Sequence, residues 1–318
     1  MRILVVTPAP SGSRTGNRVT ALRWARLLRG LGHRVRVAAE YRGQRCDLLV
    51  ALHARKSFPS IARYRREHPR APMVVALTGT DLYGDLPGTP AVRRALELAT
   101  RVVVLQPRAV AALPARWRGK TRVILQSAVG PRRRRRPRTG AWQVCVLGHL
   151  RAVKDPFRTA AAARLLPPSS RVQVLHVGGA IERSMVARAR AEERRNARYR
   201  WLGERPHAEA LEVLARSRLL CLTSTLEGGA NAVSEAAAAG VPILSSRIDG
   251  SLGLLGPRYP GYFAVGDSRG LALLLQRAES DPRFYAALRR GVRRLRRRVL
   301  PARERAGWAS LLAELGGG

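Results

Sequence analysis

The sequence predicts an α/β protein made of two doubly wound domains, and three observations carry this prediction. The chain has 318 residues, about twice the usual size of one domain. Short apolar runs alternate with stretches of helical periodicity along its whole length, which is typical of parallel sheets covered on both faces. The pattern is interrupted once, by the run PRRRRRPRTG at residues 131–140, which we interpret as a solvated linker between domains.

The first domain, residues 1–135, opens with an apolar run at Arg2–Thr7, a Pro/Gly/Ser loop and a helical stretch from Asn17 to Leu31 that ends at Gly32. Further strands are predicted at Val35–Ala39, Leu48–Leu52, Met73–Leu77, Val102–Leu105 and Val123–Leu125.

The second domain, residues 136–298, repeats this organisation. Its strands are predicted at Val144–Leu147, Val172–Val177, Tyr199–Leu202, Leu219–Thr223, Ile243–Ser245 and Tyr262–Val265. The tail from Asp281 to Leu315 is expected to be mostly helix, with a kink or break at Pro301. Two such domains place a ligand cleft between the carboxyl ends of their strands.

Composition excludes several classes of protein. With 46% hydrophobic and 25% charged residues the chain matches a globular protein and not a disordered, collagen-like or coiled-coil one. No apolar run approaches the roughly 20 residues that cross a bilayer, and none forms a signal-peptide core, so we expect a cytoplasmic protein without stable membrane insertion. Of three cysteines, Cys145 and Cys221 lie in apolar runs, which predicts neither a disulfide framework nor a metal cluster.

The net charge of +38 is unusual, and nearly all the basic residues are arginine. Such a charge creates a field that attracts phosphates, nucleic acid or an acidic membrane face. The alternative is compositional drift that replaces other surface residues by arginine and alanine. The charge therefore bears on association and not on fold.

The loop after the first strand predicts an anion site. Pro8–Arg18 holds Gly12 and Gly16 before a helix N-terminus, where backbone N–H groups and the helix dipole favour negative charge. Arg14, Asn17 and Arg18 accompany them. The spacing matches neither G-x-G-x-x-G nor a Walker A motif.

A second loop, Gly148–Pro156, leaves the first strand of the second domain and enters a helix that we expect to be capped near Asp155. Arg151 and Lys154 lie in it. Cations at that position stabilise negative charge that grows on a phosphate leaving group.

The string Glu227–Glu235 is the most specific signal in the chain. Its two glutamates stand eight residues apart, and Gly228, Gly229, Ala230, Asn231 and Ala232 lie between them at the start of a predicted helix. Backbone amides there can cradle a diphosphate while carboxylates accept hydrogen bonds from sugar hydroxyls. Helix capping is the alternative role for these side chains.

This string, followed by Gly-Val-Pro at residues 240–242, resembles the signature of glycosyltransferases with the GT-B fold and of the retaining family-4 type. The resemblance implies two Rossmann-like domains, no bound metal or other cofactor, and a last helix, residues 299–318, that packs back on the first domain. It implies that Glu235 binds the ribose of a nucleotide-sugar, Glu227 contacts the donor hexose, and Asn231 and its neighbours hold the diphosphate that Lys154 neutralises. His149 departs from the family pattern, so Arg151 is the candidate second cation.

By the same resemblance, the catalytic residues are Lys154, Arg151 and Glu227. Gly16 and Gly148 complete the donor site. Gly178, in His176–Gly179, and Trp201, in Arg200–Glu204, are expected to line the base, although Trp201 is equally compatible with a core position.

Three strings of the first domain, TPAPSGSRTGNRVTALRWARLL, DLLVALHARKS and ALTGTDLY, resemble the selenosugar synthases of selenoneine biosynthesis. That resemblance implies transfer from a UDP-sugar, UDP-N-acetylglucosamine being favoured, to selenophosphate with release of UDP. Both are substrates, and other enzymes of the pathway are possible partners. The candidate cluster on the acceptor side then comprises Gly12, Arg14, Asn17, Arg18, His53, Arg55, Lys56, Thr80 and Asp81. His53 and Asp81 also have structural interpretations, as a core histidine and a helix cap.

Two other functions stay open. A family-4 type enzyme can act instead on a hydroxyl of a glycan or lipid, with the basic first domain resting on an anionic membrane. A nucleic-acid-binding protein is the remote alternative, because aromatics are only 5% and no recognised nucleic-acid motif occurs. We therefore expect no specific nucleic-acid partner.

Overall fold

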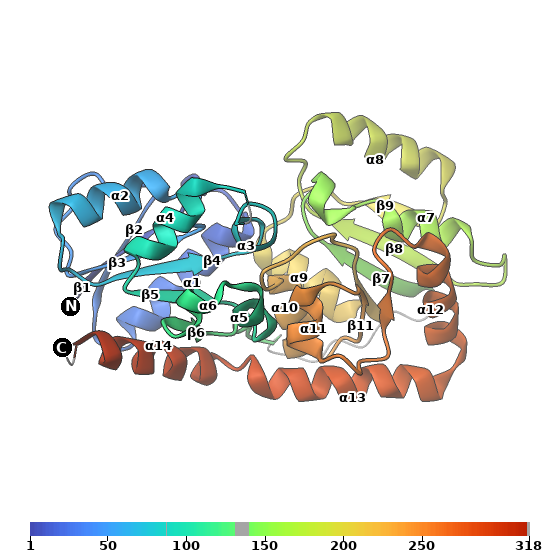
Figure 1. The fold of residues 1–318 in the computed structure, drawn as a ribbon. Helices are drawn as coiled ribbons and strands as arrows, with labels where there is room; N and C mark the ends of the chain where they lie inside the picture. The colour runs from blue at the N-terminus through green and yellow to red at the C-terminus, as the bar shows by residue number, and fades with distance from the viewer. Residues whose placement is uncertain (87, 131–139, 317–318) are drawn as a thin grey trace. The chain divides into compact units, whose positions relative to one another are not determined.

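The computed structural model describes residues 1–86, 88–130 and 140–316, and its core is two parallel six-stranded sheets (Figure 1). The chain divides into two compact units. Unit 1 comprises Met1–Gln126, Glu227–Gly229 and Pro301–Gly318, and unit 2 comprises Ser127–Leu226 and Ala230–Leu300. The predicted linker at 131–139 lies outside the described residues. The predicted α/β class with two doubly wound sheets is confirmed.

The sheet of unit 1 has the order β2-β1-β3-β4-β5-β6, and all its pairings are parallel. Its strands are β1 Arg2–Val6, β2 Arg34–Ala38, β3 Leu48–Leu52, β4 Met73–Leu77, β5 Arg101–Val104 and β6 Thr121–Val123. Its helices are α1 Gly16–Arg29, α2 Phe58–Glu67, α3 Thr80–Tyr83, α4 Pro90–Leu98, α5 Arg108–Ala112, α6 Ala115–Arg118 and α14 Pro301–Gly316. The direction of the chain reverses across the sheet between β1 and β3, which makes the carboxyl ends of these strands a switch point.

Alternation along the strands builds two cores, one on each face of this sheet. Leu49 and Ala51 of β3 join a cluster with residues of α2 and α4, whereas Leu48 and Val50 join one with residues of α1 and α14. Figure 1 shows α2 and α4 on one side of the sheet and α14 on the other. Because both faces are covered, the inner strands β3 and β4 are continuous apolar runs, whereas the edge strand β2 alternates arginine with valine.

Helix α14 is part of the core of unit 1, although it is the last helix of the chain. Trp308 is fully buried and meets Trp24 of α1 edge to face at 4.8 Å. Glu304, also buried, accepts a hydrogen bond from the Trp24 indole at 2.7 Å and pairs with Arg23 at 3.1 Å. Because this buried carboxylate contacts both Trp24 and Arg23 of α1, it fixes the register of α14 on α1.

The sheet of unit 2 has the order β12-β11-β10-β7-β8-β9, again all parallel. Its strands are β7 Trp142–Leu147, β8 Val172–Val177, β9 Tyr199–Trp201, β10 Leu219–Leu222, β11 Ile243–Ser246 and β12 Tyr262–Phe263. Its helices are η1 Ala152–Lys154, α7 Arg158–Arg164, α8 Ser184–Arg195, α9 His207–Arg216, α10 Asn231–Ala239, α11 Asp249–Leu255, α12 Ser268–Ser280 and α13 Pro282–Arg298. The switch point lies between β7 and β10.

Among the described residues, no helix has both the length and the apolar character that a bilayer crossing requires. Within the same ranges, no three His, Cys, Asp or Glu side chains gather in an arrangement that would hold a metal ion.

Candidate functional site

In unit 2 the loops that follow β7 and β10 are tied together at the switch point. The Thr225 backbone N–H donates to the Val153 carbonyl at 2.9 Å, and the Thr223 hydroxyl donates to the Lys154 carbonyl at 2.9 Å. Lys154 is thereby fixed beside the chain that continues towards α10. Arg151, half-buried, precedes the short helix η1 in the same loop. The two predicted cations therefore share one short segment at the carboxyl end of β7.

The helix cap expected at Asp155 is wrong. Asp155 follows η1 in a left-handed conformation, with φ of 42°, and α7 begins only at Arg158 after Phe157. Its side chain instead pairs with Arg158 at 2.7 Å. A single-residue reversal between two short helices has no signature in local periodicity, which is why the sequence suggested one continuous helix start.

Gly148 and Gly178 are in backbone contact, and this contact requires glycine at position 178. Gly178 has φ of 157°, and a Cβ placed on it would lie 1.9 Å from the Gly148 carbonyl oxygen. The Trp201 indole donates to the Gly178 carbonyl at 2.8 Å, and its ring is half-buried. Three predicted donor-site residues from the ends of β7, β8 and β9 thus lie together.

Two histidines that we had not assigned to the site support these loops. His176 is buried, which lowers its pKa to about 4 because the charged ring is poorly solvated there. The neutral ring donates from Nε2 to the Gly148 carbonyl at 2.9 Å, and Nδ1 accepts from the Tyr199 hydroxyl at 2.9 Å. His149 accepts the Gly179 backbone N–H at 3.1 Å. The ring at position 149, the departure from the family pattern, therefore shapes the neighbouring loop.

Helix α10 carries the second glutamate of the Glu227–Glu235 string. It begins at Asn231 after Ala230, a residue whose side chain cannot cap a helix. Asn231 is therefore the first residue of the helix and not the residue that precedes it. Glu235 is 9% exposed, and its Oε1 lies 2.9 Å from Nε2 of His207, the first residue of α9.

The segment Glu227–Gly229 groups with unit 1 and not with the unit that contains α10. The two glutamates of the string thus belong to different units. Glu227 is half-buried, as is Gly229, whereas Gly228 is buried.

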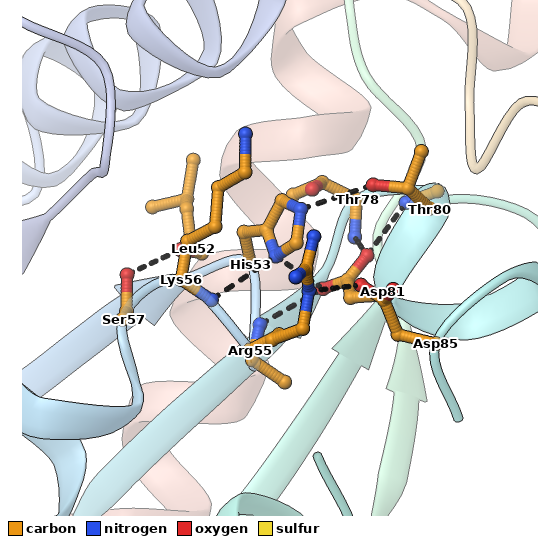
Figure 2. Close-up of polar contacts among 11 residues, drawn as sticks. Leu52, His53, Arg55, Lys56, Ser57, Thr78, Thr80, Asp81 and Asp85 are labelled. Atoms are coloured by element: carbon orange, nitrogen blue, oxygen red, sulfur yellow. Dashed lines mark hydrogen bonds and ion pairs between the residues drawn. The ribbon is translucent and has the colours of Figure 1, made fainter. Parts of the chain in front are cut away.

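In unit 1, the residues predicted after β3 and β4 meet at the carboxyl ends of these adjacent strands (Figure 2). Asp81 of α3 is fully buried, and its carboxylate accepts three backbone N–H groups at 2.9 Å, those of Ala54, Thr78 and Gly79. Helix α3 itself starts after Gly79. Asp81 therefore fastens two loops together and is not a helix N-cap.

His53 sits at the centre of this cluster in a strained conformation. Its φ is 68°, a value that non-glycine residues seldom adopt, and strained conformations of this kind cluster at functional sites. Nδ1 accepts the Lys56 backbone N–H at 3.5 Å, so the neutral ring donates from Nε2 to the Thr80 hydroxyl oxygen at 3.0 Å. Burial lowers the pKa of His53, and the nearby Lys56 and Arg55 lower it further, against the opposing Asp81 and Asp85.

The cations predicted for this side of unit 1 differ in their surroundings. Arg55 pairs with Asp85 at 2.8 Å. Lys56 is exposed and has no ion pair in residues 1–86, 88–130 or 140–316. In the loop after β1, Gly12 adopts φ of 82° in a turn, and α1 begins at Gly16 after Thr15. Arg14 is exposed, and Asn17 and Arg18 are half-buried in the first turn of α1.

Replacing Asp81 by asparagine is expected to lower the free energy of unfolding by about 2–3 kcal/mol, because an amide NH2 cannot accept and leaves buried backbone N–H groups unpaired. Urea denaturation measures the loss. Asp85→Asn is the matched control, since its partner Arg55 is half exposed, and we expect a loss below about 1 kcal/mol. Equal losses in the two variants would contradict the structural role of Asp81.

Comparisons with known proteins place this geometry in a family. The chain matches the model of glycosyl transferases group 1 over residues 132–295, just over half of its length. No curated protein matches its sequence. The structure resembles HepE (Alr3699) of Anabaena, solved with UDP and glucose and with UDP-glucose, at 18% identity and a TM-score of 0.78 over 99% of this chain and 100% of that one.

It also resembles the sucrose-phosphate synthase of Thermosynechococcus elongatus, at 17% identity and a TM-score of 0.74 over 99% of this chain and 98% of that one. A glycosyltransferase of Rickettsia africae matches at 13% identity and a TM-score of 0.70, with 99% and 98% covered. These likenesses show the GT-B fold that the sequence predicted. The chain belongs to the group 1 family of glycosyltransferases.

Proposed function

We propose that this glycosyltransferase forms a carbon–selenium bond between the anomeric carbon of a UDP-sugar and selenophosphate, and that it releases UDP. UDP-N-acetylglucosamine is the favoured donor. The bond that forms joins selenium to C1, the bond that breaks joins C1 to the diphosphate oxygen, and the electron pair of that bond leaves with UDP. No proton needs to move from the nucleophile, because selenophosphate is already an anion.

On the donor side, the proposal assigns the nucleotide-sugar to the loops of unit 2. Lys154 and Arg151 supply positive charge for the departing diphosphate, and Glu235 accepts from the ribose. The carboxyl ends of parallel strands at a switch point are the usual ligand position in such sheets, and the pinned Lys154 loop lies there.

The observation that carries the choice of nucleophile is the state of the carboxylates around His53. The Asp81 carboxylate accepts hydrogen bonds from three backbone N–H groups, and the Asp85 carboxylate forms an ion pair with Arg55. His53 has a lowered pKa, which makes it a weak base. A sugar hydroxyl needs a general base to become a good nucleophile, whereas an anionic selenophosphate needs only positive charge, which the exposed Lys56 supplies.

The distribution of lysine supports both assignments. The chain has 59 basic residues, of which only three are lysines, at positions 56, 120 and 154. Lys120 donates to the carbonyls of Glu97 and Ala99, a structural task. The other two fall in the predicted acceptor and donor clusters. In a chain otherwise dominated by arginine, these positions favour a compact ammonium over a guanidinium.

The test incubates purified protein with UDP-N-acetylglucosamine and selenophosphate under strict exclusion of oxygen. Mass spectrometry then looks for UDP and for a sugar product that carries the selenium isotope pattern. Reactions with inorganic phosphate in place of selenophosphate, and with none, measure donor hydrolysis. A selenium-containing sugar that appears in step with UDP is the expected result.

Donor left unchanged over hours, by a protein that binds UDP, would overturn the choice of nucleophile. Release of UDP only after addition of a glycan or lipid acceptor would instead favour a hydroxyl nucleophile.

A further inference from the structure

His207 contacts the carboxylate that the proposed function assigns to the ribose, and no sequence signal singled it out. It is the first residue of α9 and follows Pro206, directly after the segment that leaves β9. Its Nε2 lies 2.9 Å from Glu235 Oε1, across 28 residues of sequence. Next to a carboxylate, the ring donates from Nε2 whether it is neutral or protonated.

The two partners differ sharply in exposure. The Glu235 side chain is 10% exposed and the His207 side chain is 56% exposed. An ion pair with one exposed member contributes little to folding, roughly 0–1 kcal/mol. A buried carboxylate, in contrast, depends on its few partners for orientation. Removal of His207 therefore acts on the direction of Glu235 far more than on the stability of unit 2.

The carboxylate has acceptor capacity beyond this contact. Within the described part of the chain, His207 is the sole hydrogen-bond partner of the Glu235 side chain, and it contacts Oε1 only. An ionised carboxylate offers about four lone-pair sites on two oxygens. With Oε1 held by the ring, Oε2 is the oxygen that a ligand hydroxyl meets first.

We infer that His207 is a positioning residue for nucleotide recognition: it holds Oε1 of Glu235 so that Oε2 accepts a ribose hydroxyl of the UDP moiety. This inference rests on the assignment of Glu235 in the proposed function and deepens it. His207 thereby contributes to the preference for a ribonucleotide over a deoxyribonucleotide, through the carboxylate and without touching the base.

Calorimetric titration of the purified full-length chain with UDP tests the inference. We expect His207→Ala to weaken UDP binding about 10-fold. His207→Gln should stay within about threefold of wild type, because its amide still offers a donor near the same place. Arg205→Ala is the matched control: it removes an exposed cation two residues earlier, one whose Nε donates to the Leu202 carbonyl, and should leave the affinity within twofold.

A second ligand separates positioning from a general loss of affinity. The ligand 2′,3′-dideoxy-UDP has no ribose hydroxyl that could donate a hydrogen bond to Glu235. Wild type and His207→Ala should therefore bind it equally weakly. This double comparison measures the coupling between His207 and the ribose hydroxyls directly. Thermal unfolding of each variant, expected to match wild type, accompanies the titrations.

Equal penalties for UDP and the dideoxy ligand, or no penalty for either, would overturn the inference while leaving UDP binding in place. Failure of wild type to bind UDP, or unchanged affinity in Glu235→Gln, would overturn the donor site and this inference together. Tight, His207-dependent UDP binding without any selenium-containing product would overturn only the proposed nucleophile.

Discussion

Lys154→Ala is expected to lower kcat about 100-fold while it changes KM for the UDP-sugar severalfold at most. In the proposed reaction negative charge on the diphosphate grows as the bond to C1 breaks, and an ammonium that contacts the diphosphate would stabilise the transition state more than the bound donor. The loop that holds Lys154 is pinned by Thr223 and Thr225, which limits how far another residue can move in to replace it. Steady-state kinetics of UDP release measure the effect.

Lys120→Ala is the matched control for this experiment. It also removes a lysine ammonium, but one that donates hydrogen bonds to two backbone carbonyl groups. We therefore expect a lower melting temperature with an unchanged kcat. Lys154→Arg should recover part of the rate, because the charge remains but its shape differs. A Lys154→Ala enzyme with normal kcat and raised KM would show that this lysine binds the donor and the transition state equally well, and so does not speed the chemical step.

Gly178→Ala is expected to lower the free energy of unfolding by about 2–6 kcal/mol. The methyl group would lie 1.9 Å from the Gly148 carbonyl oxygen, and the backbone conformation at φ of 157° is one that alanine avoids. Strain of about 1–3 kcal/mol from the backbone and a similar amount or more from overpacking add together here. Denaturant unfolding followed by circular dichroism measures the sum.

Gly148→Ala provides the comparison, because a Cβ at that position meets no other atom within 4 Å. We expect this variant to lose less than about 1 kcal/mol. If the two alanine variants were equally stable, the close approach of the two loops would not be needed for folding. The indole of Trp201, which bonds the Gly178 carbonyl, would then need another explanation.

The inner strands were predictable because they are short buried runs with clear boundaries. Val172–Val177 and Leu48–Leu52, for example, coincide with β8 and β3. Their order also made the loops at the carboxyl ends identifiable as ligand positions, and His53, Thr80 and Asp81 do come together there. Periodicity and turn residues suffice for such features, since both are local properties of the sequence.

Contacts between distant segments were not predictable in the same way. The pairing of His207 with Glu235 and that of His176 with Gly148 each join residues 28 apart, and no spacing rule connects them. Sheet geometry could have suggested His207 as a site residue. It follows β9, and the carboxyl end of β9 lies at the same edge of the sheet as the start of α10. The reversal at Asp155 depends on a single positive φ angle, for which aspartate alone gives too weak a signal.

The position of α14 has a consequence for how the protein is made. Trp308 and Glu304 complete a core whose other members include Trp24, and Trp24 and Glu304 are 280 residues apart in the chain. Unit 2 is synthesised in between and has its own sheet ready to close earlier. We therefore expect the core of unit 1 to stay partly uncovered beside α1 until α14 has been translated, so that unit 2 can complete its core before unit 1 does.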